Sequence, residues 1–345
     1  MKVGIAGFSG SGKTTVWQWL TGKAPDLSKS QQGQFADADV PDERLAWLSN
    51  HFKPKKTTAA KLWLLDTPGL MPAERRDNPR RLGIMRDANG LLIVLSGHAG
   101  GDLAKELQSF REEVLFADLE IVTTRIGKLE DNLKKPRPAK IKEVDQAELD
   151  LLVRVRDTLE MGKPASALGL KEDEEKAIRS FQLLTLKPEF VLVNIGDDAI
   201  GKPLPADLLA LSPNAYAAPA KLEMELEELP AEDRQVFMKD LGLTGASRDK
   251  ALHTIFYAMG RIVFFTVGED ECRAWGLRKD ATAVEGAGEI HTDLARGFVR
   301  GEVVSYDDFR KVGSMKEAKT HGVYRLESKT YVVQDGDIMH VLAST

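Results

Sequence analysis

Features that mark secreted and membrane proteins are scarce in this sequence. Cys272 is the only cysteine in 345 residues, so no internal disulfide can form and a reducing compartment is expected. The longest apolar runs, such as residues 91–95, have strand length and are too short to cross a bilayer. The N-terminus reads as a first strand, which argues against a cleavable signal peptide. These features predict a cytoplasmic protein with no membrane partner.

An excess of positive charge is also missing. The formal net charge is −5, so bulk electrostatics predicts no DNA binding, and RNA contact would need a local basic patch. Hydrophobic residues make up 42% and charged residues 29% of the chain, as in ordinary soluble globular proteins. The length allows two or three domains, each with a sizeable core.

The clearest motif lies at residues 7–14, which read GFSGSGKT and fit the phosphate-binding loop G-x-x-x-x-G-K-[ST]. A strand pattern precedes it and a helical pattern follows. Glycines let successive N–H groups turn toward phosphates, and the helix N-terminus adds the positive end of its dipole. Lys13 is predicted to reach the β- and γ-phosphates, and the Thr14 hydroxyl to bind Mg²⁺. The predicted phosphate-binding residues are Gly7, Ser9, Gly10, Ser11, Gly12, Lys13, Thr14 and Thr15.

A second motif, DTPG at residues 66–69, follows a strand pattern. In switch NTPases the Asp of D-x-x-G orients Mg²⁺ through water, and the Gly N–H contacts the γ-phosphate. The same letters are a common turn, but the place after a phosphate loop favours the nucleotide site. Leu70 stands where Ras-like enzymes have a water-orienting Gln, and the alternative is a packed Leu. The residues assigned to catalysis are Lys13, Asp66, Gly69 and Leu70, and those assigned to Mg²⁺ are Thr14 and Asp66.

The element that binds the base is expected after the strand pattern at residues 190–194. Residues 194–197 read NIGD, close to the N-K-x-D of guanine-specific NTPases, but Ile195 takes the Lys position. The alternative is a strand followed by a polar loop. Residues 217–223 would add a second loop that contacts the base through backbone N–H groups. The predicted base-binding residues are Asn194, Ile195, Asp197, Ala218, Pro219 and Ala220, with ATP or GTP as the ligand.

The pattern divides the chain into three regions. Strands and helices alternate over residues 1–117 and again over 187–262, which predicts an α/β P-loop NTPase domain, a G-domain. Helical spacing over residues 118–186 predicts a helical hairpin inserted into that domain. Residues 263–345 are rich in β-branched residues and Gly turns, and they predict a β-rich domain. Strands are expected at residues 2–6, 62–66, 91–96, 190–194, 300–305, 323–326 and 330–333, and the β-rich region is expected to start near residues 264–268.

Two groups of basic residues attract attention. Prolines break the helical pattern at the hairpin tip, where Lys134, Lys135, Arg137, Lys140 and Lys142 gather. The tip could bind RNA phosphates, or it could be a solvated loop kept basic for solubility. After the second motif come Arg75, Arg76, Arg80, Arg81 and Arg86. One of them could stabilise transition-state charge, but a solvated loop is favoured.

Longer segments resemble the YchF family of Obg-related P-loop NTPases. The resemblance is closest at residues 264–268, 273–275, 288–293, 296–298, 302–309 and 333–337, and it extends to residues 40–45, 53–56 and 183–188. It implies a G-domain, an inserted coiled-coil hairpin and a C-terminal TGS-like domain. It also implies that ATP is accepted at least as well as GTP, and that the ribosome is a partner through the hairpin tip and the TGS-like domain.

The sequence departs from this family at functional positions. Gly10 replaces an Asn that helps to hold a monovalent cation in related NTPases. Residues 28–37 occupy the first switch and contain no Thr, so the usual Mg²⁺ ligand there is missing or replaced. We therefore expect a ribosome-associated switch NTPase with slow hydrolysis. The alternatives are a nucleotide-dependent adaptor without turnover and a small-molecule kinase, against which D-x-x-G and N-x-x-D argue.

Overall fold

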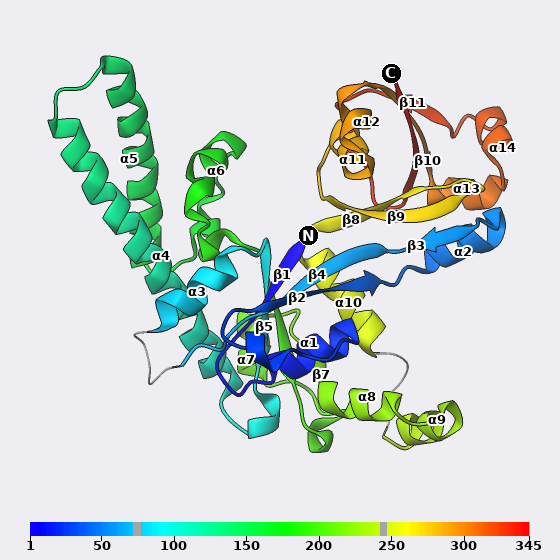
Figure 1. The fold of residues 1–345 in the computed structure, drawn as a ribbon, viewed down its shortest axis with the longest axis horizontal. Helices are drawn as coiled ribbons and strands as arrows, with labels where there is room; N and C mark the ends of the chain where they lie inside the picture. Colours follow the sequence, from blue (N-terminus) through cyan, green and yellow to red (C-terminus); the bar gives the residue numbers. More distant parts are fainter. Residues whose placement is uncertain (72–76, 242–246, 345) are drawn as a thin grey trace. The chain divides into compact units, whose positions relative to one another are not determined.

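The computed structural model describes residues 1–71, 77–241 and 247–344 (Figure 1). The chain forms two compact units. One, here called the phosphate-loop unit, contains Lys2–Ala36 and Leu64–Gly245. The other, the β-rich unit, contains Met1, Asp37–Trp63 and Ala246–Thr345. Residues 37–63 thus group with the C-terminal residues, whereas the sequence pattern places them in the P-loop domain.

The first sheet has six strands in the order β2-β4-β1-β5-β6-β7. Its strands are β1 (Lys2–Ala6), β2 (Gln34–Val40), β4 (Ala60–Asp66), β5 (Gly90–Leu95), β6 (Glu189–Asn194) and β7 (Tyr216–Ala218). The pairs β1–β5, β5–β6 and β6–β7 are parallel. Because parallel strands end at the same edge of a sheet, the loops after β1 and β6 are brought to one side.

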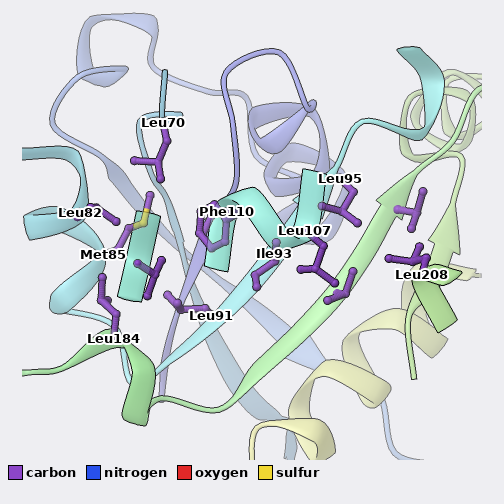
Figure 2. Packing of buried hydrophobic residues seen from close by; sticks show 14 residues of the cluster. Leu70, Leu82, Met85, Leu91, Ile93, Leu95, Leu107, Phe110, Leu184 and Leu208 are labelled. Atoms are coloured by element: carbon purple, nitrogen blue, oxygen red, sulfur yellow. The ribbon is translucent and has the colours of Figure 1, made fainter. Parts of the chain in front are cut away.

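Helices and an apolar cluster support this sheet. The helices of the phosphate-loop unit are α1 (Lys13–Thr21), α3 (Asn78–Arg86), α4 (Leu103–Lys134), α5 (Ala139–Glu160), α6 (Glu172–Ile178), α7 (Ala206–Leu211), α8 (Ala220–Glu227) and α9 (Ala231–Asp240). Figure 2 shows Leu107 and Phe110 of α4 packed with Leu91 and Ile93 of β5 in one buried cluster. All six β5 residues are buried, which matches their unbroken apolar sequence.

The helices α4 and α5 form the hairpin visible in Figure 1. The prolines at 136 and 138 lie between them, because α4 ends at Lys134 and α5 begins at Ala139. Val122, Ile126 and Val155 belong to the apolar cluster that joins the helices. Near the tip, the apolar residues of the helical pattern are not all buried, since Val144 is 63% exposed. The helix α4 starts at Leu103 and runs without a break through the predicted boundary at residue 118.

The β-rich unit contains a second sheet, in the order β11-β10-β12-β8-β9-β3. The strands are β3 (Lys56–Thr58), β8 (Arg261–Thr266), β9 (Glu271–Arg278), β10 (Phe298–Ser305), β11 (Arg325–Glu327) and β12 (Asp337–Ala343). The helices are α2 (Glu43–Phe52), α10 (Ser247–Ala258), α11 (Ala283–Ile290), α12 (Thr292–Arg296), α13 (Tyr306–Val312) and α14 (Met315–Thr320). Cys272 on β9 is buried, and burial raises the pKa of its thiol.

The strand predicted at residues 330–333 is wrong. In the structure only Val332 makes an isolated bridge, to Thr282, and the chain then turns through Gly336 at a φ of 89°. The sequence pattern also misses β2, β3, β7, β8, β9 and β12. β2 reads QFADADV, and Asp and Ala are poor strand formers, so tertiary pairing decides its conformation. Within the described residues, no helix has the length and apolar character needed to span a bilayer.

Candidate functional site

The loop between β1 and α1 has the backbone of a phosphate-binding loop. Gly7, Gly10 and Gly12 all have positive φ, which lets the chain curl before α1 begins at Lys13. A Cβ on Gly12 would lie 2.1 Å from Asn194 Nδ2, so only glycine fits there. The N-terminus of α1 therefore opens directly from the loop, in the arrangement that binds phosphates. Thr15 lies in the first turn of this helix.

Lys13 is a buried cation, with 6% of its surface exposed. Its Nζ donates a hydrogen bond to the carbonyl oxygen of Phe8, at 2.6 Å. Burial lowers the pKa of Lys13 to about 8, although Asp66 and Glu106 oppose the shift through their charges. Ser9 and Gly10 are exposed, whereas the Ser11 hydroxyl is buried and has no hydrogen-bond partner within the described residues. Phosphate oxygens would satisfy both Lys13 and Ser11.

Asp66 lies at the end of β4 and receives two hydrogen bonds on one oxygen. Thr14 Oγ1 donates to Asp66 Oδ2 at 2.9 Å, and Gln34 Nε2 donates to the same oxygen at 3.2 Å. Burial raises the pKa of Asp66, against the effect of these bonds. Asp66 Oδ1 is buried and has no partner in the described part of the chain. The carboxylate thus has an unused oxygen beside a threonine hydroxyl.

This donor set fits Mg²⁺. Mg²⁺ typically uses one or two protein ligands and takes the rest from water and substrate phosphates. Across residues 1–71, 77–241 and 247–344, no cluster of three His, Cys, Asp or Glu side chains could hold a metal alone. At Thr14 and Asp66 a Mg²⁺ ion would have two protein ligands, and water and nucleotide phosphates would supply the others.

The backbone of the second motif is bonded to the phosphate loop. Ser9 N donates to Leu70 O at 2.8 Å, and Leu70 N donates to Gly7 O at 3.1 Å. A Cβ on Gly69 would lie 2.7 Å from Lys13 Nζ and from the backbone of Ser9, so this approach requires glycine. The Leu70 side chain is fully buried in the cluster of Figure 2, with Met85 and Phe110. This position agrees with the alternative given above, that Leu70 is a packed core residue.

The two predicted base-binding loops lie side by side. Pairing of β6 with β7 places Asn194 opposite Ala218, and Ile195 N donates to Ala218 O at 3.0 Å. Asn194 is buried, and its Nδ2 donates to Ser11 O at 3.3 Å, which connects this edge to the phosphate loop. Asp197 is exposed at the start of a 3₁₀ turn. Pro219 and Ala220, at the start of α8, are buried.

Three side chains near the loop are not among the site residues that the motifs predict. Gln34 contacts Asp66, as described above. His98 Nδ1 lies 3.3 Å from Asn194 O. Glu106 accepts a hydrogen bond from Ser96 Oγ at 2.7 Å. Each comes from a segment that only the sheet brings to this edge.

The arginines after the second motif are not all solvated. Arg75 and Arg76 lie outside the described residues. Arg81 on α3 is buried, and Arg86 Nη1 lies 2.6 Å from Asp118 Oδ1 on α4. Arg80 is exposed. The solvated loop favoured from the sequence is therefore wrong for Arg81 and Arg86, because α3 packs them against its neighbours.

A sheet in which β1, β5, β6 and β7 run parallel, with a phosphate loop after β1, D-x-x-G after β4 and an Asn-containing turn after β6, defines a P-loop NTPase of the switch class. A family model, YchF-GTPase_C, described as "Protein of unknown function (DUF933)", matches residues 262–344. The chain is 31% identical over 366 residues to "Ribosome-binding ATPase YchF" of Bacillus subtilis (strain 168), covering 99% of this chain and 98% of that protein. The chain belongs to the YchF family.

Two further comparisons agree with this assignment. The chain is 30% identical over 367 residues to "Obg-like ATPase 1" of Oryza sativa subsp. japonica, covering 98% of this chain and 91% of that protein. The solved structure of the Schizosaccharomyces pombe YchF GTPase matches with a TM-score of 0.83 at 27% identity, covering 99% of this chain and 97% of that one. The predicted fold, a P-loop G-domain with a C-terminal β-rich domain, is thereby confirmed.

Proposed function

We propose that this chain is a ribosome-associated switch NTPase that binds a purine nucleoside triphosphate at residues 7–14. The observation that carries the proposal is the convergence of three features. Lys13 is a buried ammonium group with no ion pair in the described residues. Thr14 is bonded to Asp66, and the segment around Gly69 is bonded to the loop.

In this proposal, different residues of the chain bind the phosphates and the metal. Loop N–H groups and Lys13 hold the phosphates, while Thr14 and Asp66 hold Mg²⁺. The metal, when bound, supplies charge neutralisation at the β- and γ-phosphates. Gln34 holds the Asp66 carboxylate in place from the first-switch segment, where the family resemblance leads one to expect a Thr. Gly69 allows the close approach of its own backbone to Lys13.

Hydrolysis is expected to be slow. The side chain after Gly69 is Leu70, which is packed in the core and cannot orient water. The second candidate, an adaptor that binds nucleotide without turnover, is favoured by this same packing. Single-turnover hydrolysis separates the two, because the adaptor leaves the bound triphosphate intact while the NTPase converts it to diphosphate and phosphate.

Base discrimination is proposed to be weak, with ATP preferred. Ile195 offers no charged group over the base, and Asn194 is engaged with Ser11. Asp197 is exposed and could accept from guanine, so a GTP preference above about a hundredfold, or about 2.7 kcal/mol, would contradict this proposal. In that case Asp197→Asn should remove the preference.

The proposed ribosome association is based on the relatives, whose names describe ribosome-binding ATPases. We propose that the hairpin tip and the TGS-like domain make the contact, and a cytoplasmic location follows from such a role. We also propose the division into a G-domain of residues 1–117 and 187–262, an inserted hairpin of residues 118–186 and a TGS-like domain of residues 263–345.

Lys13→Ala tests the nucleotide site. Removing a charge-assisted contact to phosphate should weaken Mg²⁺-dependent ATP binding by about 2–3 kcal/mol or more in calorimetry. The matched control is Lys128→Ala, an exposed lysine on α4 that should leave the dissociation constant unchanged. An unchanged dissociation constant for Lys13→Ala would refute the site.

A further inference from the structure

The β-rich unit contains a pocket of about 280 Å³, separate from the phosphate loop. Its lining comes from the start of β4, from β8 and β9, and from two helices. The side chains relevant to binding are Trp63, Phe256, Trp275, Lys61, Arg261 and Arg273. Aromatic and cationic groups thus share one small concave site.

Trp63 offers an available aromatic face. It is 44% exposed, although it lies on a strand whose next two residues, Leu64 and Leu65, are buried. Within the described residues its ring makes no aromatic or cation–π contact. A tryptophan ring exposed in a pocket is the group on which a planar ligand stacks.

Arg273 is a fixed planar cation in the same pocket. Its guanidinium lies 3.8 Å from the centroid of the Trp275 ring. Trp275 is itself held, because its Nε1 donates to Thr266 Oγ1 at 2.9 Å and its ring stacks on Phe264. In the described part of the chain, Arg273 has no carboxylate within ion-pair distance. Its guanidinium donors are therefore available to an anion.

The other charges leave a positive surplus. Glu289 is the one carboxylate in the lining, against Lys61, Arg261 and Arg273. Lys61 is paired with Asp37 at 2.5 Å. Arg261 Nε donates to Met1 Sδ at 3.2 Å, and burial lowers the pKa of Arg261. A guanidinium that is partly desolvated and opposed only by Glu289 stabilises an incoming anion.

We propose that this pocket binds one nucleotide unit, with the base stacked on Trp63 and the phosphate held by Arg273 and Arg261. Stacking surface and planar guanidinium donors together match a base that carries a phosphate. The volume suits one such unit. A free mononucleotide and a single-stranded RNA both supply this chemistry. If the ligand is RNA, this proposal extends the proposed ribosome association and depends on it, because the ribosome would supply the single strand.

Full-length protein carrying Lys13→Ala, which disables the phosphate loop, is titrated with a single-stranded RNA hexamer and separately with AMP and UMP. Trp63→Ala and Arg273→Gln are each added to this background. Each should weaken binding about fivefold or more, since stacking on one aromatic ring has that magnitude. Arg273→Lys should restore charge but only part of the affinity, because it lacks the planar fork. Arg300→Gln, an exposed arginine on β10, is the control and should bind as the parent does.

Loss of hexamer binding in both pocket variants identifies RNA as the source when the mononucleotides bind far more weakly. Mononucleotides that bind as tightly as the hexamer identify a free nucleotide instead. The proposal is overturned if the parent binds neither probe, or if Trp63→Ala and Arg273→Gln bind as Arg300→Gln does. The assay contains no ribosome and no triphosphate, so these outcomes leave the proposed function untouched.

Discussion

At the scale of single residues, the site depends on groups whose charge is costly in the free protein. Lys13 is buried, and its pKa falls to about 8. Asp66 is buried, and its pKa is raised. Both shifts come from loss of water, so a ligand that brings phosphate and metal restores the charged forms. Under the proposed function, Mg²⁺ and triphosphate would therefore bind more strongly together than either alone.

Nucleotide affinity should fall as the pH rises above about 8. In the free protein Lys13 loses its proton near that value, while bound phosphates hold the proton and raise the pKa. Binding then takes up a proton, and affinity is greatest below the free pKa and decreases by up to about tenfold per pH unit above it. Calorimetry at pH 7 and at pH 9.5 measures this. Lys13→Ala should remove the pH dependence, and a dependence that persists in that variant would assign it to another group.

Gln34→Leu should weaken nucleotide binding only when Mg²⁺ is present. The amide of Gln34 holds Asp66 Oδ2, and a hydrogen bond to a charged acceptor contributes about 1.5–3 kcal/mol. We expect an affinity loss of about tenfold or more with Mg²⁺ and little change with a chelator. Gln31→Leu, at an exposed position of the same segment, is the control. An equal loss in the chelator would mean that Gln34 supports the fold and not the metal site.

At the scale of elements, one carboxylate joins three segments at the base of the hairpin. Asp118 on α4 is fully buried and accepts from Arg86 on α3 at 2.6 Å. It also accepts from Leu184 N at 3.1 Å and from Thr185 N at 2.7 Å. The helix after the second motif and the hairpin therefore share a buried ion pair.

Asp118→Asn should destabilise the protein by about 3 kcal/mol or more. The substitution keeps the shape but leaves the Arg86 charge largely buried and without its counter-charge. Chemical denaturation measures the loss. Asp131→Asn, which breaks an exposed pair with Lys134, should cost less than about 1 kcal/mol. If both variants lose similar stability, the pair at the hairpin base contributes no more than a surface ion pair.

At the scale of the whole molecule, the basic residues at the hairpin tip fall into two groups: some form ion pairs and others do not. Lys134 is paired with Asp131, and Arg137 is paired with Asp145. Within the described residues, Lys135, Lys140 and Lys142 form no ion pair. Available lysines displace counterions from RNA, whereas paired ones must first give up a carboxylate.

The triple replacement of Lys135, Lys140 and Lys142 by Ser should therefore weaken ribosome co-sedimentation. The slope of log affinity against log salt should decrease by about one for each phosphate that the tip no longer neutralises. The double replacement of Lys134 and Arg137 by Ser is the matched comparison and should have the smaller effect. Unchanged sedimentation in both variants would make the tip a solvated loop, which is the alternative that the sequence leaves open.

Features that depend on neighbours in the chain follow from the sequence alone. The strand, the glycine spacing and the helix start around residues 7–14 are local, so their pattern predicts β1, the loop and α1. The hairpin follows in the same way, because helical spacing and the prolines at its tip act within a few residues. The unpredicted strand β2 and the absent strand at 330–333 mark the limit, since strand pairing is a property of two segments.

Which distant residues meet depends on the tertiary fold. Gln34 reaches Asp66, and Asn194 reaches Ser11, because the sheet brings the ends of separate strands to one edge. Leu70 directly follows the D-x-x-G motif, yet its side chain belongs to the core, because burying an apolar group is favourable. Trp63 and Arg273 line one pocket although they lie far apart in the sequence. No local pattern predicts such a pairing, because it arises from the path of the chain through space and not from the spacing of its residues.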